Sequence, residues 1–508
     1  MSDASVAAAL RSQARLVVIE APAGCGKTYQ GAGYAYDLAP TLGHGRLLVL
    51  AHTHAACDVF ATKARSASAR IEIRTIDSLI AQIAAAYHTV LGLPADPSAW
   101  ARRNPGIGYK QLAYKVAHLL DQAPMVAHAM TQRYPVVICD EHQDCSSDQH
   151  AVAMALHRAG AALRVFGDPM QRIFGGRADD AAAGAAQWSV LVKRADGCET
   201  LDTPHRWFPD SDKLGQWILA ARETLRGGGK IDLRGALPAG LTVLVAENQA
   251  QQQDGYQVST PDRKPIDAIV GARSPLLILA AHNATVNALR SFFNRRIPIW
   301  EGHTRDGLSA LVAHIQQNKG DPTAIAQGMV KFLSEVAVGF SPTAFSSEFL
   351  KEIAAGCSAR RRGKPATLQE LGRYLLAQPD HHGVAAALHR LEALVRSNPA
   401  FFGSIHIDLR QEFHDAIRLR EFEDCEEGLS EINRRRTHGR PSPPIRAIST
   451  VHKAKGLECD NVVLMPCDAR HFRDADASRC LLYVGMSRAM RTLTLVVSRT
   501  NTCPLFII

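Results

Sequence analysis

The chain has 508 residues, of which 46% are apolar and 21% are charged, so it is long enough for two to four domains and too apolar to be disordered. Its net charge of +9 is compatible with a polyanionic partner but does not establish one. The eleven cysteines include no CxxC pair and no Cys/His spacing suited to zinc, and no apolar run is long enough to cross a membrane, so we expect a cytoplasmic protein with reduced thiols.

The earliest motif reads APAGCGKT and begins at Ala21, where the usual motif has glycine. The run RLVVIE before it predicts a buried strand, and KTYQGAGYAYDLA after it predicts a helix. In this arrangement backbone N–H groups and the positive end of the helix converge on a phosphate. Gly24 and Gly26 would let the backbone approach, Lys27 would neutralise the β- and γ-phosphates, and Thr28 would hold Mg²⁺. An ordinary strand–turn–helix is the alternative.

Residues 80–133 contain AQIAAAY and YKQLAYKVAHLLDQA, whose apolar spacing predicts a small helical insertion. The strand Tyr134–Cys139 then carries Asp140 and Glu141 to its carboxyl end, where open α/β sheets bind ligands. Hydrolysis needs a carboxylate near Mg²⁺ and a base that deprotonates water. We therefore assign the metal to Asp140 and the water to Glu141, with a solvated acidic loop as the alternative.

A further strand, Leu163–Phe166, leads into GDPMQRIFG. The polar side chain of Gln171 could sense the γ-phosphate from this strand end. Phe174 offers a flat face for a base, and simple core packing is the alternative for this residue.

In the second half, LTVLVAEN and PLLILAAHN predict strands of another parallel sheet, which resumes near residue 443 with PPIRAIST and ends with TLTLVVSR. The interval 300–442 is rich in amphipathic helical patterns such as VAAALHRLEALVRS. Its basic runs ARRRGKP and NRRRTHGR are either solvated faces or a surface for duplex DNA or a partner. The cluster DHHG at 380–383 is more typical of a helix cap than of a metal site.

Six segments occur in this order: APAGCGKT, TIDSL, DEHQD, GDPMQRIFG, STVHKAKGLE and LLYVGMSRA. Together they resemble the UvrD/Rep-like helicases of superfamily 1. The resemblance implies an α/β fold of the P-loop NTPase class, with two RecA-like parallel-sheet motor domains and helical inserted subdomains. The expected boundaries are 1–200 for the first motor domain with its helical insertion at about 80–133, 201–299 and 443–508 for the second, and 300–442 for the inserted helical subdomain.

The resemblance also implies roles for individual residues, with ATP and Mg²⁺ as cofactors. The implied catalytic residues are Lys27, Asp140, Glu141, Gln171, Arg206 and Arg488. The implied nucleotide contacts are Ala23, Gly24, Cys25, Gly26, Lys27, Thr28, Gly456 and Glu458, with Thr28 and Asp140 at the metal. The implied nucleic-acid contacts are His52, Thr53, Thr75, Ser78, Phe174, Thr450 and His452. For each threonine, a cap or strand position is the alternative.

Several positions depart from the family pattern. Gln13 lies nearer to the phosphate loop than the usual adenine-reading glutamine, so adenine specificity is open. His205 stands where the family has tyrosine, and Ala477 and Ser478 replace the usual acidic pair before the last motif. ATP hydrolysis tolerates such changes more easily than processive unwinding does.

The leading hypothesis is an ATP-dependent DNA translocase or helicase that moves 3′ to 5′ on single-stranded DNA, the polarity being implied by the resemblance alone. The first alternative is a DNA-stimulated ATPase that serves as the sensor subunit of a nuclease complex. Short proteins of this kind also resemble the helicase subunit of the Gabija anti-phage defence system, and no nuclease-like acidic constellation is found near the end of the sequence. A non-enzymatic binding module is the second alternative. We expect DNA, including a duplex junction, and a nuclease subunit as partners, and no membrane.

Overall fold

The computed structural model describes residues 2–51, 70–104, 107–174, 178–251, 255–301, 305–438 and 443–508. The chain divides into two compact units. One comprises Met1–Ile297 with Ile445–Ile508, and the other comprises Pro298–Pro444. Each unit is described by itself.

A six-stranded parallel sheet with strand order β3-β2-β4-β5-β1-β6 forms the first half of the larger unit. Its strands are β1 (Leu16–Glu20), β2 (Leu47–Ala51), β3 (Ile71–Thr75), β4 (Val136–Cys139), β5 (Ala162–Gly167) and β6 (Gly197–Thr200). The interior strands β1 and β2, each paired on both sides, are buried along their whole length, because helices cover both faces of a parallel sheet.

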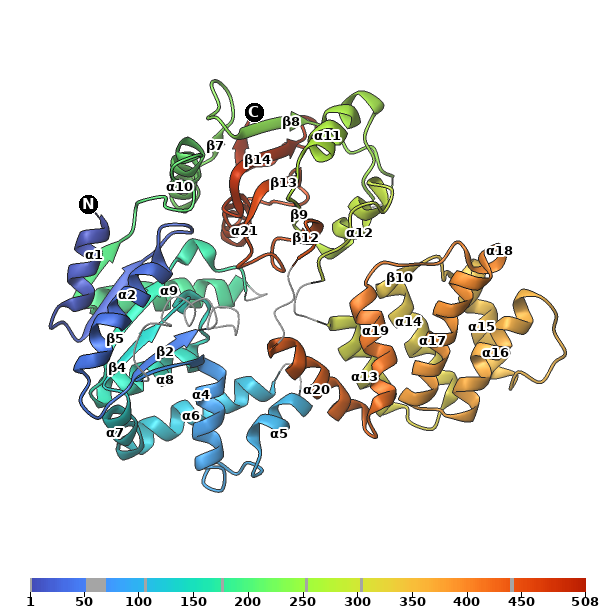
Figure 1. The fold of residues 1–508 in the computed structure, drawn as a ribbon, viewed down its shortest axis with the longest axis horizontal. Coiled ribbons are helices and arrows are strands. Elements are labelled where there is room, and N and C mark those ends of the chain that lie inside the picture. The colour runs from blue at the N-terminus through green and yellow to red at the C-terminus, as the bar shows by residue number, and fades with distance from the viewer. Residues whose placement is uncertain are drawn as a thin grey trace. The chain divides into compact units, whose positions relative to one another are not determined.

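Helices cover both faces of this sheet. They are α1 (Ser2–Arg11), α2 (Lys27–Leu38), α4 (Ile76–Ala86), α5 (Pro97–Arg103), α6 (Gly108–Gln122), α7 (Pro124–Arg133), α8 (Ser147–Ala159) and α9 (Ala178–Arg194), with 3₁₀ turns at Ala39–Thr41, His142–Asp144 and Pro169–Gln171. Along β1, Leu16 and Val18 join the core formed with α4, α6 and α8, whereas Val17 and Ile19 join the core formed with α1 and α2. Figure 1 shows α4, α5, α6 and α7 grouped at the lower edge of the sheet.

The second sheet of the larger unit is also parallel, with order β12-β9-β13-β14-β8. Its strands are β8 (Leu241–Val245), β9 (Leu276–Ala280), β12 (Arg446–Thr450), β13 (Cys459–Cys467) and β14 (Ala489–Val497). Its helices are α10 (Asp212–Arg226), α11 (Thr260–Ala272), α12 (Asn283–Phe292) and α21 (Asp476–Met486), and β7 (Ile231–Asp232) pairs with β15 (Phe506–Ile507). Two parallel sheets wrapped by helices confirm the predicted α/β fold with RecA-like motor domains.

The smaller unit is almost entirely helical, and Figure 1 draws it in yellow and orange as helices packed side by side. Its elements are α13 (Asp306–Gln317), α14 (Pro322–Val336), β10 (Ala337–Val338), a π turn (Pro342–Ser346), α15 (Ser347–Ala354), α16 (Lys364–Ala377), α17 (His381–Ser397), α18 (Pro399–Phe402), β11 (His406–Ile407), α19 (Arg410–Arg418), a 3₁₀ turn (Leu419–Glu421) and α20 (Cys425–His438). Leucine and phenylalanine side chains from these helices form one continuous core. Across the described part of the chain, no helix has the length and apolarity needed to cross a membrane. The domain boundaries expected from the sequence stay a prediction.

Candidate nucleotide and nucleic-acid site

The loop APAGCGKT joins β1 to α2 and begins directly after the last strand residue, Glu20. Gly24 and Gly26 have φ values of +77° and +84°, a left-handed backbone that favours glycine. A Cβ atom at Gly24 would also lie 2.7 Å from the Trp207 ring and 2.8 Å from Cβ of Arg206. Glycine is therefore required here both for the backbone conformation and for the close approach of the segment that follows β6.

The ammonium group of Lys27, the first residue of α2, is held by two carboxylates from the end of another strand. Its Nζ lies 3.0 Å from Oδ1 of Asp140 and also bonds Oε1 of Glu141. The N–H of Asp140 donates to the carbonyl of Leu50 at 2.8 Å, which fixes the residue at the carboxyl end of β4. Glu141 has a φ of +53°, uncommon for a residue with a side chain and often found at functional sites. The structure thus brings Lys27, Asp140 and Glu141 together.

Burial and mutual attraction act in opposite directions on these three groups. Burial lowers the pKa of Lys27, but Asp140 and Glu141 outweigh it, so this pKa is raised above its ordinary value. Burial raises the pKa of Asp140, and Lys27 opposes that rise. Burial also acts to raise the pKa of Glu141, but Lys27 and Lys455 outweigh it, so the pKa of Glu141 lies below its ordinary value. The cluster therefore contains a lysine cation against the carboxylate anion of Glu141.

Gln143 connects this cluster to the end of β5. Its Nε2 donates to Glu141, and its Oε1 accepts from the N–H of Asp168 at 3.0 Å. Asp168 in turn accepts at Oδ2 from Nε2 of Gln171, at 2.9 Å. No role is assigned to Gln143 from the sequence alone. Its place in the motif DEHQD, two residues after Glu141, is the feature that could have indicated one.

Arg206 lies against the phosphate loop and against the end of α21. Its N–H donates to the carbonyl of Gly24 at 3.0 Å, and its Nη1 donates to the carbonyl of Ser487 at 2.5 Å. Its Nη2 pairs with Glu458. Two of the predicted site residues, Arg206 and Glu458, are therefore in direct contact.

Arg488 is buried two residues after the end of α21. Its guanidinium donates to two backbone carbonyls, at 2.9 and 3.3 Å, and to Oγ of Ser487 at 2.8 Å. Burial and then the nearby Arg206 lower the pKa of Arg488 to about 10, and Glu141 acts in the opposite direction. Arg206 bonds the carbonyl of Ser487, the residue directly before Arg488, and so connects this segment to the phosphate loop.

The other predicted nucleotide contacts lie around the same loop. The N–H of Ala23 donates to the phenolic oxygen of Tyr483 at 2.9 Å. Cys25 is buried, and burial, followed by Asp168, raises the pKa of its thiol to about 12, so it is an inert thiol. Thr28 is the second residue of α2, and Gly456 has a φ of +86°.

Among the predicted nucleic-acid contacts, Thr75 and Ser78 bond each other at the start of α4. Oγ1 of Thr75 accepts from the N–H of Ser78 at 3.1 Å, and Oγ of Ser78 donates to the carbonyl of Thr75 at 2.8 Å. Thr75 is therefore the N-cap of this helix, and a phosphate contact by either residue stays a prediction. His52 and Thr53 lie outside the described residues.

Phe174, Thr450 and His452 lie near one another. The Phe174 side chain is 50% exposed, and its ring centroid lies 6.2 Å from that of His452 and 5.0 Å from Nζ of Lys455. Thr450 ends β12, and its Oγ1 accepts from the N–H of Lys453 at 3.2 Å. Burial lowers the pKa of His452, which favours the neutral ring. An exposed aromatic face beside a cation is suited to stacking on a base.

Lys455 is a second residue without an assigned role in the sequence. Its Nζ donates to Oδ2 of Asp144 at 2.6 Å and to the carbonyl of Gln171 at 2.7 Å. Burial raises the pKa of Asp144 to about 6, although Lys455 opposes the rise. Both residues lie within quoted motifs, but their pairing across the chain required the structure.

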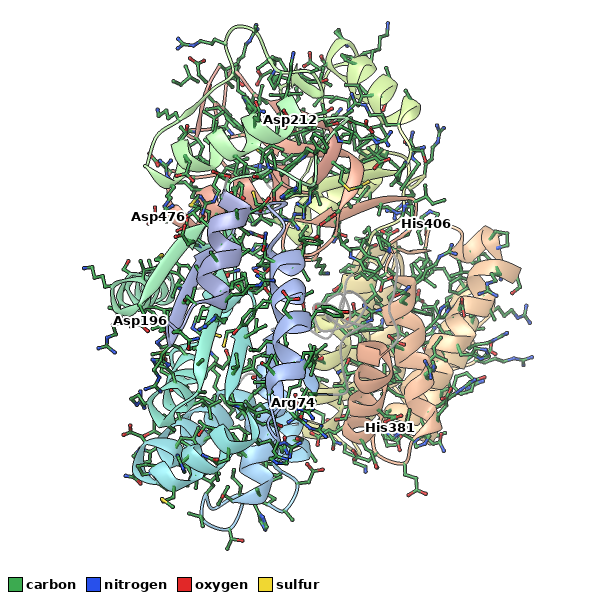
Figure 2. The ribbon with its side chains drawn as sticks, turned by 60° about the vertical axis from the view of Figure 1, so that its left-hand side comes forward. Arg74, Asp196, Asp212, His381, His406 and Asp476 are labelled. Atoms are coloured by element: carbon green, nitrogen blue, oxygen red, sulfur yellow. The ribbon has the colours of Figure 1, made fainter. Side chains whose placement is uncertain are left out.

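In the smaller unit, Asp380, His381 and His382 bring three ligand atoms within 4.8 Å of one another, and Figure 2 labels His381. Asp380 accepts from the N–H groups of His382 at 2.8 Å and Gly383 at 3.4 Å, as the N-cap of α17. Nε2 of His381 bonds the carbonyl of Phe422 at 2.9 Å. The cap interpretation is confirmed, and the positive end of the helix disfavours a cation there.

Two family models match segments of the chain that contain predicted nucleotide-site residues. The model for the UvrD/REP helicase N-terminal domain matches residues 99–182, which include Asp140, Glu141 and Gln171. The model for the UvrD-like helicase C-terminal domain matches residues 447–496, which include Arg488. The chain therefore contains segments similar to both the N-terminal and the C-terminal domain of UvrD-like helicases. At the level of the family, these domains support ATP-dependent DNA helicase or translocase activity.

Among curated proteins, the chain is similar to the RecBCD enzyme subunit RecB of Mycolicibacterium smegmatis. It is 30% identical over 175 residues, which is 34% of this chain. The match covers 14% of the length of RecB. The likeness to the Gabija helicase subunit stays a prediction.

Proposed function

We propose that this chain is an ATP-dependent DNA translocase that moves 3′ to 5′ on single-stranded DNA and couples ATP hydrolysis to strand movement or unwinding. The observation that supports it most directly is the convergence of cations and carboxylates from both halves of the larger unit. Lys27 bonds Asp140 and Glu141, and Arg206 bonds both Gly24 of the phosphate loop and Ser487, the residue before Arg488. A triphosphate bound here would meet a lysine, a base and an arginine at once.

The roles follow from the charges of these groups. Glu141 is a weak base while Lys27 pairs with it, because that pairing keeps its pKa low. The γ-phosphate of ATP competes for Lys27 and frees the carboxylate. Glu141 then takes a proton from the attacking water as the bond from the γ-phosphorus to the leaving oxygen of ADP breaks. Arg206 and Arg488 stabilise the charge on the transferring phosphoryl group.

Thr28 lies in the first turn of α2, which follows β1, and Asp140 directly follows β4; these two strands flank β5 in the sheet. The hydroxyl of Thr28 and the carboxylate of Asp140 are hard oxygen donors, the kind that Mg²⁺ prefers. Bound there, the ion would neutralise charge on the phosphate oxygens. Asp140 also contacts Lys27, so the lysine and the metal ion would compete for one carboxylate.

Contacts with single-stranded DNA would come from the exposed ring of Phe174, from His452 and from Thr450. Stacking and phosphate contacts of this kind carry little sequence preference, as a translocating motor requires. Lys455 lies beside the Phe174 ring and bonds the backbone carbonyl of Gln171, so it connects the proposed base-stacking ring directly to the predicted γ-phosphate sensor.

The test is ATPase activity measured without nucleic acid and with single-stranded DNA, duplex DNA or RNA, followed by strand displacement on duplexes with a 3′ or a 5′ tail. We expect stimulation by single-stranded DNA and displacement from a 3′ tail. Hydrolysis that no nucleic acid stimulates would contradict the proposal, and displacement only from a 5′ tail would contradict the polarity.

A second candidate is a DNA-stimulated ATPase that acts as the sensor subunit of a nuclease complex and unwinds little by itself, as in anti-phage defence. The name of the related RecB, a subunit of the RecBCD enzyme, favours it. A strand-displacement assay with and without a co-purifying nuclease separates the two. Full unwinding by the isolated chain supports the motor, whereas stimulated ATPase without unwinding supports the sensor.

A further inference from the structure

A buried arginine outside the quoted motifs joins the two halves of the larger unit. Arg222, on α10, is 1% exposed. Its Nε and Nη2 lie 3.1 and 2.6 Å from Oδ1 of Asp168, and its Nη2 lies 2.6 Å from Oε1 of Glu20. Both carboxylates belong to the first sheet, whereas α10 packs against α21 and β14 of the second.

The two carboxylates lie at functionally placed strand ends. Glu20 is the last residue of β1, directly before the phosphate loop, and Asp168 directly follows β5. Parallel strands bring these positions to the same edge of the sheet. The guanidinium of Arg222 therefore bridges the base of the phosphate loop to the start of GDPMQ.

Asp168 passes this contact on to the predicted γ-phosphate sensor. Its Oδ1 is held by Arg222 and by the N–H of Met170 at 3.1 Å, while its Oδ2 accepts from Nε2 of Gln171 at 2.9 Å. Its own N–H is held by Gln143. With every side of the carboxylate engaged, the orientation of the Gln171 amide depends on Arg222.

On its other side, Arg222 lies beside α21, which leads to Arg488. The Tyr483 ring centroid, on this helix, is 5.9 Å from Cζ of Arg222, and the Tyr483 hydroxyl accepts from the N–H of Ala23 in the phosphate loop. Figure 2 labels Asp212 and Asp476, the first residues of α10 and α21. Movement of α10 relative to Asp168 therefore moves the helix that ends next to Arg488.

The ion pair is poorly explained by stability alone. Burial lowers the pKa of Arg222, but Asp168 outweighs burial and the pKa is raised, so the group is a cation. Taking such charges out of water costs free energy that apolar side chains of similar size would not cost. A buried charged contact of this kind is suited to specifying one arrangement of α10 relative to the strand ends of the first sheet.

On the basis of the proposed function, we propose that Arg222 is a positioning residue that couples the Gln171 sensor to α21 and Arg488. When Gln171 bonds the γ-phosphate, its partner Asp168 moves together with the Gln171 side chain. Arg222, which bonds Asp168, transmits this displacement to α10 and α21. Arg222 itself touches no phosphate. Its removal should impair turnover and leave nucleotide affinity largely intact.

The experiment compares Arg222→Lys, which keeps the charge but loses the forked contact, with Arg226→Met on the same helix. Arg226 bonds Glu20 but has no bond to Asp168, so it is a matched control. We expect R222K to lower the DNA-stimulated kcat on the order of 10²-fold, the cost of misplacing a catalytic group by about 1 Å, while the KM for ATP changes little. R226M should keep the turnover of the unchanged protein.

A double-mutant cycle with Gln171→Ala separates coupling from general damage. If Arg222 and Gln171 act through each other, the double variant R222K/Q171A loses no more kcat than Q171A alone. A loss in the double variant equal to the product of the two single losses would overturn the inference. Should R222K fail to fold, the same cycle is run with Asp168→Asn, which keeps the shape of the side chain, and the same two outcomes apply. If the protein without substitutions shows no DNA-stimulated ATPase activity, the proposed function is refuted. If that protein is active but the losses of kcat in R222K and Q171A multiply in the double variant, only the coupling is refuted.

Discussion

Lys27 is the residue on which the nucleotide site depends most directly, because its single ammonium group compensates two buried carboxylates. We predict that Lys27→Ala lowers ATP turnover by at least about 10²-fold, as expected when a group that stabilises the transition state is lost. Binding of single-stranded DNA should remain measurable by fluorescence anisotropy, since Lys27 is assigned to the nucleotide whereas Phe174 is assigned to DNA. Lys193→Ala, an exposed lysine on α9, is the control, and unchanged turnover in K27A would refute the phosphate-loop assignment.

Arg488 is more deeply buried than Arg206, whose side chain is 11% exposed and pairs with Glu458. We predict that Arg488→Lys lowers kcat by about 10²-fold while the KM for ATP stays within a few-fold, because a finger that acts on the transition state contributes little to ground-state binding. The control is Arg491→Lys, an arginine whose side chain is 61% exposed. A loss confined to KM would exclude a transition-state role for Arg488.

At the scale of the element, Thr75 at the start of α4 is either a helix cap alone or also a contact to a DNA phosphate. Its hydroxyl oxygen caps the helix, so Thr75→Ala should lower the free energy of unfolding by about 1 kcal/mol. Thr75→Asp keeps a capping acceptor but places a negative charge at the predicted phosphate contact. If Thr75 binds DNA, T75D keeps the thermal midpoint and weakens binding of single-stranded DNA. Equal DNA affinity in both variants would leave Thr75 as a cap alone.

The 3₁₀ turn His142–Asp144 makes folding stability depend on pH. In the folded chain, burial raises the pKa of Asp144 from 3.8 to about 6, and its Oδ1 is buried without a hydrogen-bond partner. A raised carboxyl pKa means that the folded state binds the proton more tightly. Asp144 therefore contributes fully to the free energy of unfolding below its unfolded pKa of 3.8. That contribution, about 3 kcal/mol, is lost as the pH rises through about 6.

Asp144→Asn removes this titration while keeping an oxygen for Lys455. We predict that the thermal midpoint of D144N, relative to that of the unchanged protein, rises between about pH 4 and pH 8. Thermal unfolding followed across this range provides the measurement. A difference that stays constant with pH would contradict the raised pKa.

For the whole molecule, the net charge of +9 predicts binding to single-stranded DNA that weakens linearly on a log–log plot against salt. Phe174→Ala should lower affinity for oligo(dT) by about 1–3 kcal/mol without changing that slope, because stacking releases no counterions. Anisotropy titrations at several salt concentrations give both quantities. A changed slope with unchanged affinity at low salt would contradict a stacking role.

The sequence predicted the fold class because apolar runs such as RLVVIE and YPVVIC are typical of buried strands. They form β1 and β4; β1 leads through the phosphate loop to Lys27 at the start of α2, and Asp140 and Glu141 directly follow β4. Local patterns suffice here, since each residue's position follows from the strand that carries it.

The remainder of the site could not be predicted in this way. The pairings of Lys455 with Asp144 and of Arg206 with Glu458 join residues 311 and 252 positions apart, and that of Arg222 with Asp168 joins residues 54 positions apart. No spacing rule connects them, because the contacts exist only once two separate sheets face each other.

By itself, then, the amino-acid sequence determined that two parallel α/β sheets form and which side chains stand at their strand ends. The tertiary structure alone decided which of those charges compensate one another, and that Thr75 caps a helix while Arg222 is withdrawn from water between two carboxylates. The physical reason is range: strand and helix patterns are set by neighbours in the chain, whereas the energy of a charge depends on every group that surrounds it after folding.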